Sequence, residues 1–406
     1  MPEDALYAAQ VRCRGDQAQS IWLGDMAGKR KLAICVRRGS VKKVLSLLLI
    51  ALLFTAGAGC RRDITLPYIM PVTIVRNNVH ITIDPRVELM STVQYLSDYD
   101  ELITTATFAY RADVDEYFAD FRKHKAVAMY EDMVANGFRY SVPASFALSL
   151  TPNLHLDDSV QLSYHVRWGG GGEKKLAEFA AALRDFSLRS NFHDFFVSHE
   201  EYYLENINHV ATLLEKHDYA TELTDYYGIE YASFNILPVP LYGGGAGYGP
   251  HVERKDRVDI YSILCAFDEQ MSGEVPSYGS INTFKSLQRH EFSHSFVNPT
   301  TEMFLDEVMK YEYLLEPIQE EMDKLNYGSW ITCLNEHIVR AVNTRLAYSD
   351  SRREGNQALA RELEAGFIYT KILVNALEEY ENYRDKYPDF ISFYPKLLEA
   401  LVNNPS

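Results

Sequence analysis

Two histidines and a glutamate form the part of this sequence best suited to chemistry. His290, Glu291 and His294 lie in a stretch of helical pattern that we expect Pro299 to end. Residues four apart on a helix lie one turn above each other, so both imidazoles can reach one tetrahedral metal ion. Glu291 is turned about 100° from His290 and misses the metal, which leaves it as general base for a metal-bound water. The spacing therefore predicts a Zn²⁺ site.

A catalytic zinc site needs a third protein ligand and one open position. Position 300, where a third histidine six residues after His294 would fall, holds a threonine, which argues against a three-histidine site. We favour Glu336, because an unpaired carboxylate in its otherwise apolar helical stretch would be costly. Arg340, one turn later, could hold the second carboxylate oxygen. The other candidate ligands are Glu312, Glu316 and His337. A plain Glu336–Arg340 ion pair is the alternative without a metal.

Features around the site suggest how a substrate would bind. Segment 231–241 is apolar but contains Pro238 and Pro240, which cannot donate to a central ladder, so we expect an edge strand that could pair with an extended peptide. A glycine-rich loop follows, whose backbone a substrate could approach closely. The predicted substrate-binding residues are Gly244, Gly245 and Tyr248. For stabilising an oxyanion, the candidates are Tyr369 and Tyr248.

The elements that must position these residues show two periodicities. Short alternating strands are expected on either side of Asn77 and Asn78, a pair that tolerates the positive φ of a tight turn. Helical periodicity is expected in four segments, 85–96, 114–136, 173–189 and 198–217. Strands are expected in 231–241 and 258–267, and helices from about 280 onward. The pattern predicts an α+β fold, mostly helical, with a small mixed sheet and an active-site helix. We expect it to form one domain over 81–402, or two lobes divided near 228–280.

The first sixty residues are expected to lie outside that fold. Residues 41–60 place two lysines before an apolar run and end in small residues at Cys60, which resembles a bacterial lipoprotein signal peptide. The run is too short to cross a membrane, which takes about twenty residues. We expect lipidation at Cys60 and a tether over 61–80 that includes the start of the hairpin. Residues 1–40 are expected to be an over-extended gene model or disordered.

Composition and charge exclude some classes of function. The chain is 47% hydrophobic and carries a net charge of −16, and the first sixty residues hold nine Lys/Arg against four Asp/Glu. The remainder therefore has 31 basic and 52 acidic residues, which argues against nucleic-acid binding. Beyond the leader only Cys265 and Cys333 remain, as one disulfide or as two buried free thiols. With no C-x-x-C pair, a thiolate zinc site is excluded.

Several ordered segments together resemble a family of bacterial exported proteins classed as domain of unknown function 4932. The segments are 83–91, the glycine loop at 241–250, 290–299 and 335–342. The resemblance covers about residues 80–400 and implies a zincin-like core of the gluzincin type. It also implies that His290, His294 and Glu336 bind zinc and that Glu291 is the base.

The site and the leader predict a zinc-dependent metallopeptidase, a hydrolase anchored in the cell envelope. Because Arg61 is not the aspartate that commonly retains lipoproteins in the inner membrane, we expect the outer membrane. The expected partners are a peptide or protein substrate and, through the lipid alone, a membrane. Two other functions fit the same residues: a non-catalytic binding lipoprotein on a peptidase fold, and a zinc amidase acting on a non-peptide substrate.

Overall fold

The chain divides into two compact units, Met1–Thr65 and Leu66–Ser406. The computed structural model describes residues 66–97, 102–267, 271–272 and 274–403, and the backbone of one earlier hairpin. That hairpin pairs β1 (Ala18–Gly24) with β2 (Lys31–Arg37). The predicted signal peptide, Cys60 and Arg61 lie outside the described residues, so the lipoprotein assignment stays a prediction.

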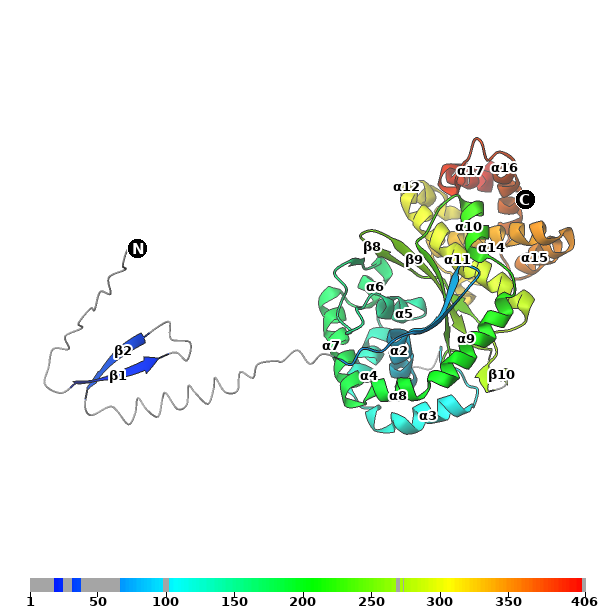
Figure 1. Ribbon diagram of the computed structural model, residues 1–406. Coiled ribbons are helices and arrows are strands. Elements are labelled where there is room, and N and C mark those ends of the chain that lie inside the picture. Colours follow the sequence, from blue (N-terminus) through cyan, green and yellow to red (C-terminus); the bar gives the residue numbers. More distant parts are fainter. Residues whose placement is uncertain are drawn as a thin grey trace, which may run out of the picture. The chain divides into compact units, whose positions relative to one another are not determined.

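A mixed sheet crosses the second unit in the order β3-β4-β6-β9-β8-β5, with β7 also paired to β9 (Figure 1). The central strands β4, β6 and β9 are parallel to one another, and the remaining pairs are antiparallel. The strands are β3 (Val72–Arg76), β4 (Val79–Ile83), β5 (Val160–Gln161), β6 (Ser233–Val239), β7 (Gly247–Tyr248), β8 (His251–Arg254) and β9 (Val258–Cys265). A separate small hairpin joins β10 (Met271–Ser272) to β11 (Val275–Pro276). The predicted α+β class, mostly helical with a mixed sheet, is confirmed.

Helices cover the sheet and make up most of the unit. They are α2 (Pro85–Leu96), α3 (Ala109–Tyr117), α4 (Lys125–Val134), α5 (Ser141–Leu148), α6 (Tyr164–Gly169), α7 (Glu173–Arg189), α8 (Phe192–Ser198), α9 (Glu200–Leu214), α10 (Tyr219–Tyr227), α11 (Ile281–Met303), α12 (Leu305–Val308), α13 (Gln319–Lys324), α14 (Trp330–Asp350), α15 (Arg352–Glu364), α16 (Thr370–Asn382) and α17 (Phe390–Asn403). Short 3₁₀ turns lie at Ala119–Phe121, Met309–Leu314 and Glu316–Ile318. Helix α11 packs on β9, and α14 packs on α11, which brings the two halves of the predicted site together.

Local signals account well for the β3–β4 hairpin and the helix after it. Asn77 and Asn78 have φ of 49° and 64°, as the predicted tight turn requires. The Asp84 carboxylate then caps α2 by accepting from the Arg86 amide, with Pro85 at the first helical position.

The prediction of an edge strand at 231–241 is wrong. Strand β6 lies in the middle of the sheet, between β4 and β9. The prolines are tolerated because β4 pairs with β6 only as far as Ile236. Among the described strands, Pro238 therefore pairs with β9 alone, and Pro240 lies beyond the end of the strand.

The prediction that Pro299 ends the metal-site helix is also wrong. Helix α11 continues through Pro299 to Met303. A proline removes the hydrogen bond to the carbonyl four residues earlier, which here belongs to Ser295. The Tyr231 hydroxyl donates to that carbonyl at 2.6 Å and replaces the missing bond.

Two further sequence questions are answered by the core. Cys265 and Cys333 are both buried and free, so the alternative of two buried thiols holds. In the described part of the chain, no helix is both long enough and apolar enough to cross a membrane.

Candidate metal centre

Three donor atoms from two helices converge in the second unit. His290 and His294 lie one turn apart on α11, and Glu336 lies on α14. The two Nε2 atoms are 3.2 Å apart, and the Glu336 carboxylate oxygens lie 3.6 Å from His290 Nε2 and 3.3 Å from His294 Nε2. Among the described residues, this is the group of three metal-binding side chains that could share one ion.

The spacing of these atoms fits a zinc ion. Ligands about 2.0–2.1 Å from a tetrahedral zinc lie about 3.3–3.4 Å from one another. The two Nε2 atoms are 3.2 Å apart, and each approaches a different oxygen of Glu336, His290 at 3.6 Å from Oε2 and His294 at 3.3 Å from Oε1. The Glu336 Oε2 atom is buried and accepts no hydrogen bond, so although Arg340 lies 3.3 Å away it keeps lone pairs available for a metal ion. Two imidazoles and one carboxylate are also the donor set of a catalytic zinc site with one open position.

Groups behind the donors orient them. The Nδ1 atom of His294 lies 3.4 Å from the Asn298 side-chain oxygen; a proton held there leaves Nε2 free for a metal. Arg340 Nε lies 3.3 Å from Glu336 Oε2, as the sequence predicted, and its Nη1 donates to Glu362 at 2.7 Å. The Arg340 guanidinium also stacks 3.9 Å above the Phe367 ring. These contacts limit the rotation of the Glu336 carboxylate.

The charges of the donor group depend on one another. Burial would raise the pKa of Glu336, but His294, His290 and Arg340 hold it at about 2. Burial would lower the pKa of His294, but Glu336 raises it to about 9, whereas burial lowers the pKa of His290 to about 3. Without a metal, His294 therefore carries a proton that zinc must displace.

Glu291 lies next to His290 on α11, and the backbone of Gly247 and Gly249 packs against it. Its side chain is buried, and burial raises its pKa to about 7. A Cβ placed on Gly247 would stand 2.9 Å from Glu291 Oε1, so β7 lies directly against the carboxylate. A carboxyl group with a pKa near neutrality can both accept and return a proton, as a general base requires.

A neighbouring salt-bridge network fixes the position of α11. Arg289 is 2% exposed and donates to Glu222 of α10 and Asp350 of α14. It directly precedes His290, so the same turn of α11 is tied to two other helices. The sequence offered no signal for these partners, which lie more than sixty residues away.

Comparison with protein families agrees with the resemblance seen in the sequence. Residues 79–400 match the domain of unknown function DUF4932. The chain belongs to this family. No curated protein and no solved structure matched the chain. The DUF4932 match spans all the donors described above.

The glycine loop at 241–250 contacts Glu291 through Gly247 and Gly249 and not through the predicted Gly244 and Gly245. Within the DUF4932 domain, Gly244 and Gly245 have φ of 84° and 62°, and Gly245 packs on Phe267. Tyr248 pairs with Ile263 of β9, and its ring lies 6.4 Å from that of Tyr140. The residues that contact Glu291 are Gly247 and Gly249. Their presence in the same glycine run was the only signal in the sequence.

The structure does not place Tyr369 with the metal donors. Its hydroxyl donates to the Leu314 carbonyl at 2.7 Å, and its ring packs on His337. The tyrosine that the sequence analysis missed is Tyr327, which is half-buried in the loop before α14. Burial, with smaller contributions from the charges of Glu336 and Glu291, raises its pKa to about 12. Its ring lies 6.0 Å from that of Phe367, which Arg340 covers.

The alternative third ligands lie elsewhere. Glu312 and Glu316 are exposed on the 3₁₀ turns that precede α13. His337 is buried and donates from Nδ1 to the Cys333 carbonyl at 2.8 Å. Burial lowers its pKa to about 4, so it is neutral between the rings of Phe367 and Tyr369. None of the three belongs to the donor group.

Proposed function

We propose that this protein is a zinc-dependent peptidase with a zincin-like core of the gluzincin type. The observation that supports the proposal is the convergence of His290, His294 and Glu336, whose nearest donor atoms lie 3.2, 3.3 and 3.6 Å apart, near the spacing of ligands around a tetrahedral zinc. Glu291 beside that triangle supplies a base with a pKa of about 7. Together they form the minimum machinery of metal-assisted hydrolysis.

We assign one task in this reaction to each of three side chains, Glu291, Tyr327 and Arg340. Bound zinc supplies Lewis acidity toward a substrate carbonyl and lowers the pKa of water. Glu291 accepts the proton of the attacking water and returns it to the leaving amine. We assign to Tyr327, near Arg340 and Phe367, the task of donating a hydrogen bond to the oxyanion that develops on the substrate carbonyl. Arg340 keeps the Glu336 carboxylate oriented toward the metal.

A peptide substrate is favoured by the strand next to Glu291. Strand β7 pairs with β9 along one edge, and no other strand in the described chain pairs with it. An extended peptide that lay along β7 would run beside Glu291, whose carboxylate Gly247 contacts.

The test is a single substitution at the base. Glu291→Gln keeps the shape of the side chain but cannot accept a proton. We expect it to retain about one zinc per chain by elemental analysis and to lose cleavage of a peptide library followed by mass spectrometry. Glu307→Gln, on the exposed surface of α12, is the matched control and should match wild type. A purified protein without zinc, or a Glu291→Gln variant of full activity, would disprove the proposal.

We further propose that the enzyme is held in the bacterial envelope by a lipid on Cys60. The support is the lysine-flanked apolar run that ends at this cysteine. Cys60→Ser should move the protein from the membrane fraction to the soluble periplasmic fraction. If the variant stays with the membrane, something other than the lipid anchors the protein.

A further inference from the structure

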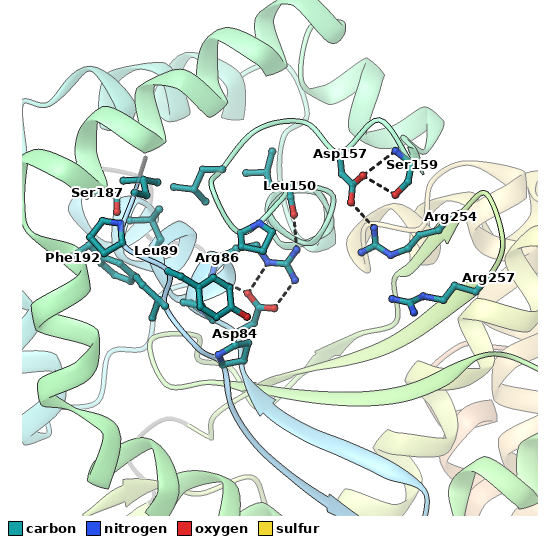
Figure 2. Close-up of a pocket in the computed structure, with 18 of the residues that line it drawn as sticks. Asp84, Arg86, Leu89, Leu150, Asp157, Ser159, Ser187, Phe192, Arg254 and Arg257 are labelled. Atoms are coloured by element: carbon teal, nitrogen blue, oxygen red, sulfur yellow. Dashed lines mark hydrogen bonds and ion pairs between the residues drawn. The ribbon is translucent and has the colours of Figure 1, made fainter. Parts of the chain in front are cut away.

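A cavity of about 510 Å³ lies apart from the metal centre and shares no lining residue with it (Figure 2). It lies between residues 66–71, the start of α2, the loop that contains Leu150 and Asp157, the junction of α7 and α8, and the β8–β9 turn. Protein interiors are packed with few voids larger than a water molecule. A volume of this size falls instead in the range of about 300–1,000 Å³ that is usual for small-molecule sites.

One end of the cavity is apolar. Figure 2 shows Leu89 of α2 and Phe192 of α8 together at this end, with the small Ser187 beside them. Ile69, Pro85 and Leu154 add further apolar wall. Leu89 and Phe192 are each 1% exposed, so their positions are fixed by the core rather than by solvent. This end suits a hydrocarbon or aromatic group.

An ion pair between Arg86 and Asp84 also lines the cavity. Arg86 donates from Nε to Asp84 at 3.0 Å and from Nη2 to the same carboxylate at 2.6 Å. Its Nη1 donates to the Leu150 carbonyl at 2.6 Å. Because every nitrogen of this guanidinium is already engaged, the pair shapes the cavity but offers little to a ligand.

The opposite end presents a guanidinium with unused donors. Figure 2 shows Arg254 and Arg257 pointing into the cavity from the β8–β9 side. Arg254 is shared between Asp157 and Asp259, whereas Arg257 donates only from Nε, to Asp259 at 3.2 Å. The two terminal amino groups of Arg257 have no partner among the described residues. Such a fork is suited to a carboxylate or phosphate oxygen pair.

We propose that this cavity binds a small organic anion, with an apolar body against Leu89 and Phe192 and the acid group on Arg257. The site is independent of the zinc chemistry proposed above. Asp256 lines the same end as Arg257 and would repel an anion, so the charge preference is the feature to test. Because the Arg257 side chain is 55% exposed, we expect a modest preference, of about fivefold, for the charged head group.

Three probes with one body and different heads make the test. Binding of 4-phenylbutyrate, 4-phenylbutanol and 4-phenylbutylamine to the full chain is measured by calorimetry. We expect the acid to bind one per chain and about fivefold more tightly than the alcohol, with the amine weakest. Arg257→Gln should make the acid and the alcohol equal without changing the affinity of the alcohol. The matched control Arg353→Gln, on exposed α15, should change nothing.

A blocking variant locates the body of the probe. Ser187→Leu should fill the apolar end and weaken all three probes at least tenfold, with the fold checked by circular dichroism. If this variant fails to fold, the Arg257→Gln comparison alone decides. The proposal is overturned if the acid shows no saturable binding, if acid and alcohol bind equally to wild type, or if the amine binds most tightly. The last result would assign the head group to Asp256.

Discussion

Gly249 lies against the backbone of Glu291 so closely that no side chain fits between them. A Cβ at position 249 would stand 1.8 Å from the Glu291 carbonyl oxygen and 3.0 Å from the Cβ of His294. The segment after β7 and the metal-site helix are therefore in backbone contact at the turn that carries the chemistry. Only glycine permits this contact, which helps to set the position of α11 against the sheet.

Gly249→Ala should therefore disturb the site itself. The methyl group forces β7 or α11 to move, and we expect a loss of about 3 kcal/mol or more in stability together with weaker zinc binding. Gly244→Ala is the control, because its φ of 84° is strained for alanine but its Cβ would meet nothing within 4 Å. It should cost about 1 kcal/mol and leave zinc content unchanged. Equal zinc loss in both variants would contradict the role given to Gly249.

Substitutions at the third ligand should follow a fixed order of zinc affinity. Glu336→Ala removes a ligand and should be worst, and Glu336→Gln should be intermediate because an amide oxygen is a poorer donor. Arg340→Ala should reduce affinity by about 10–100-fold, as loss of an orienting group does. Competition with a chromogenic chelator measures all three. Glu312→Ala and Glu316→Ala serve as controls near wild type, and zinc loss in either would shift the assignment away from Glu336.

Substitutions at Tyr327 and Tyr369 should have different effects on kcat. Tyr327→Phe should lower kcat by about 10²–10³-fold with zinc content unchanged, because it removes a donor aimed at the developing charge. Tyr369→Phe should leave kcat unchanged and cost about 1 kcal/mol of stability, since its hydroxyl is engaged with the Leu314 carbonyl. The opposite pattern would restore the assignment made from sequence.

Stability should fall with rising pH through the buried carboxyl group of Glu88 on α2. Glu88 is 1% exposed, and burial raises its pKa to about 7 although Tyr110 donates a hydrogen bond to it. The folded protein therefore holds this proton more strongly than the unfolded chain, whose pKa is about 4.5. The contribution is complete below pH 4.5 and is lost as pH rises to about 7, on the order of 3 kcal/mol. Glu88→Gln keeps the acceptor and should remove this part of the slope in urea titrations at pH 5 to 8. If the stability of both proteins depended on pH in the same way, the role given to Glu88 would be refuted.

Loss of Arg289 should destabilise the protein far more than loss of Lys285, although both side chains pair with Asp350. Arg289→Met leaves Glu222 and Asp350 without their buried partner, and we expect a cost of about 3 kcal/mol in chemical denaturation. Lys285→Met removes a partly exposed ion pair to the same Asp350 and should cost about 1 kcal/mol or less. Similar costs for the two variants would show that burial of Arg289 matters little.

Short-range patterns in the sequence predicted the parts that depend on adjacent residues. The helical spacing of His290, Glu291 and His294, the turn at Asn77 and Asn78, and helices α2 and α7 follow from local periodicity. The predicted helical segment 114–136 is divided between α3 and α4, and α5 and α6 were not predicted. Glu336 was also within reach of this reasoning, because a carboxylate in an apolar helical stretch needs a partner. Each of these inferences uses contacts within about one or two helical turns.

Tertiary structure decided everything that joins distant segments. Which carboxylate joins His290 and His294 depends on how α14 packs on α11, and Tyr327, from a separate loop, is close enough to Glu336 and Glu291 for their charges to raise its pKa. The order of strands made β6 central despite its prolines, and the Tyr231 hydroxyl let α11 pass through Pro299. Periodicity cannot predict such contacts, because it reports which face of an element is buried but not which neighbour covers that face.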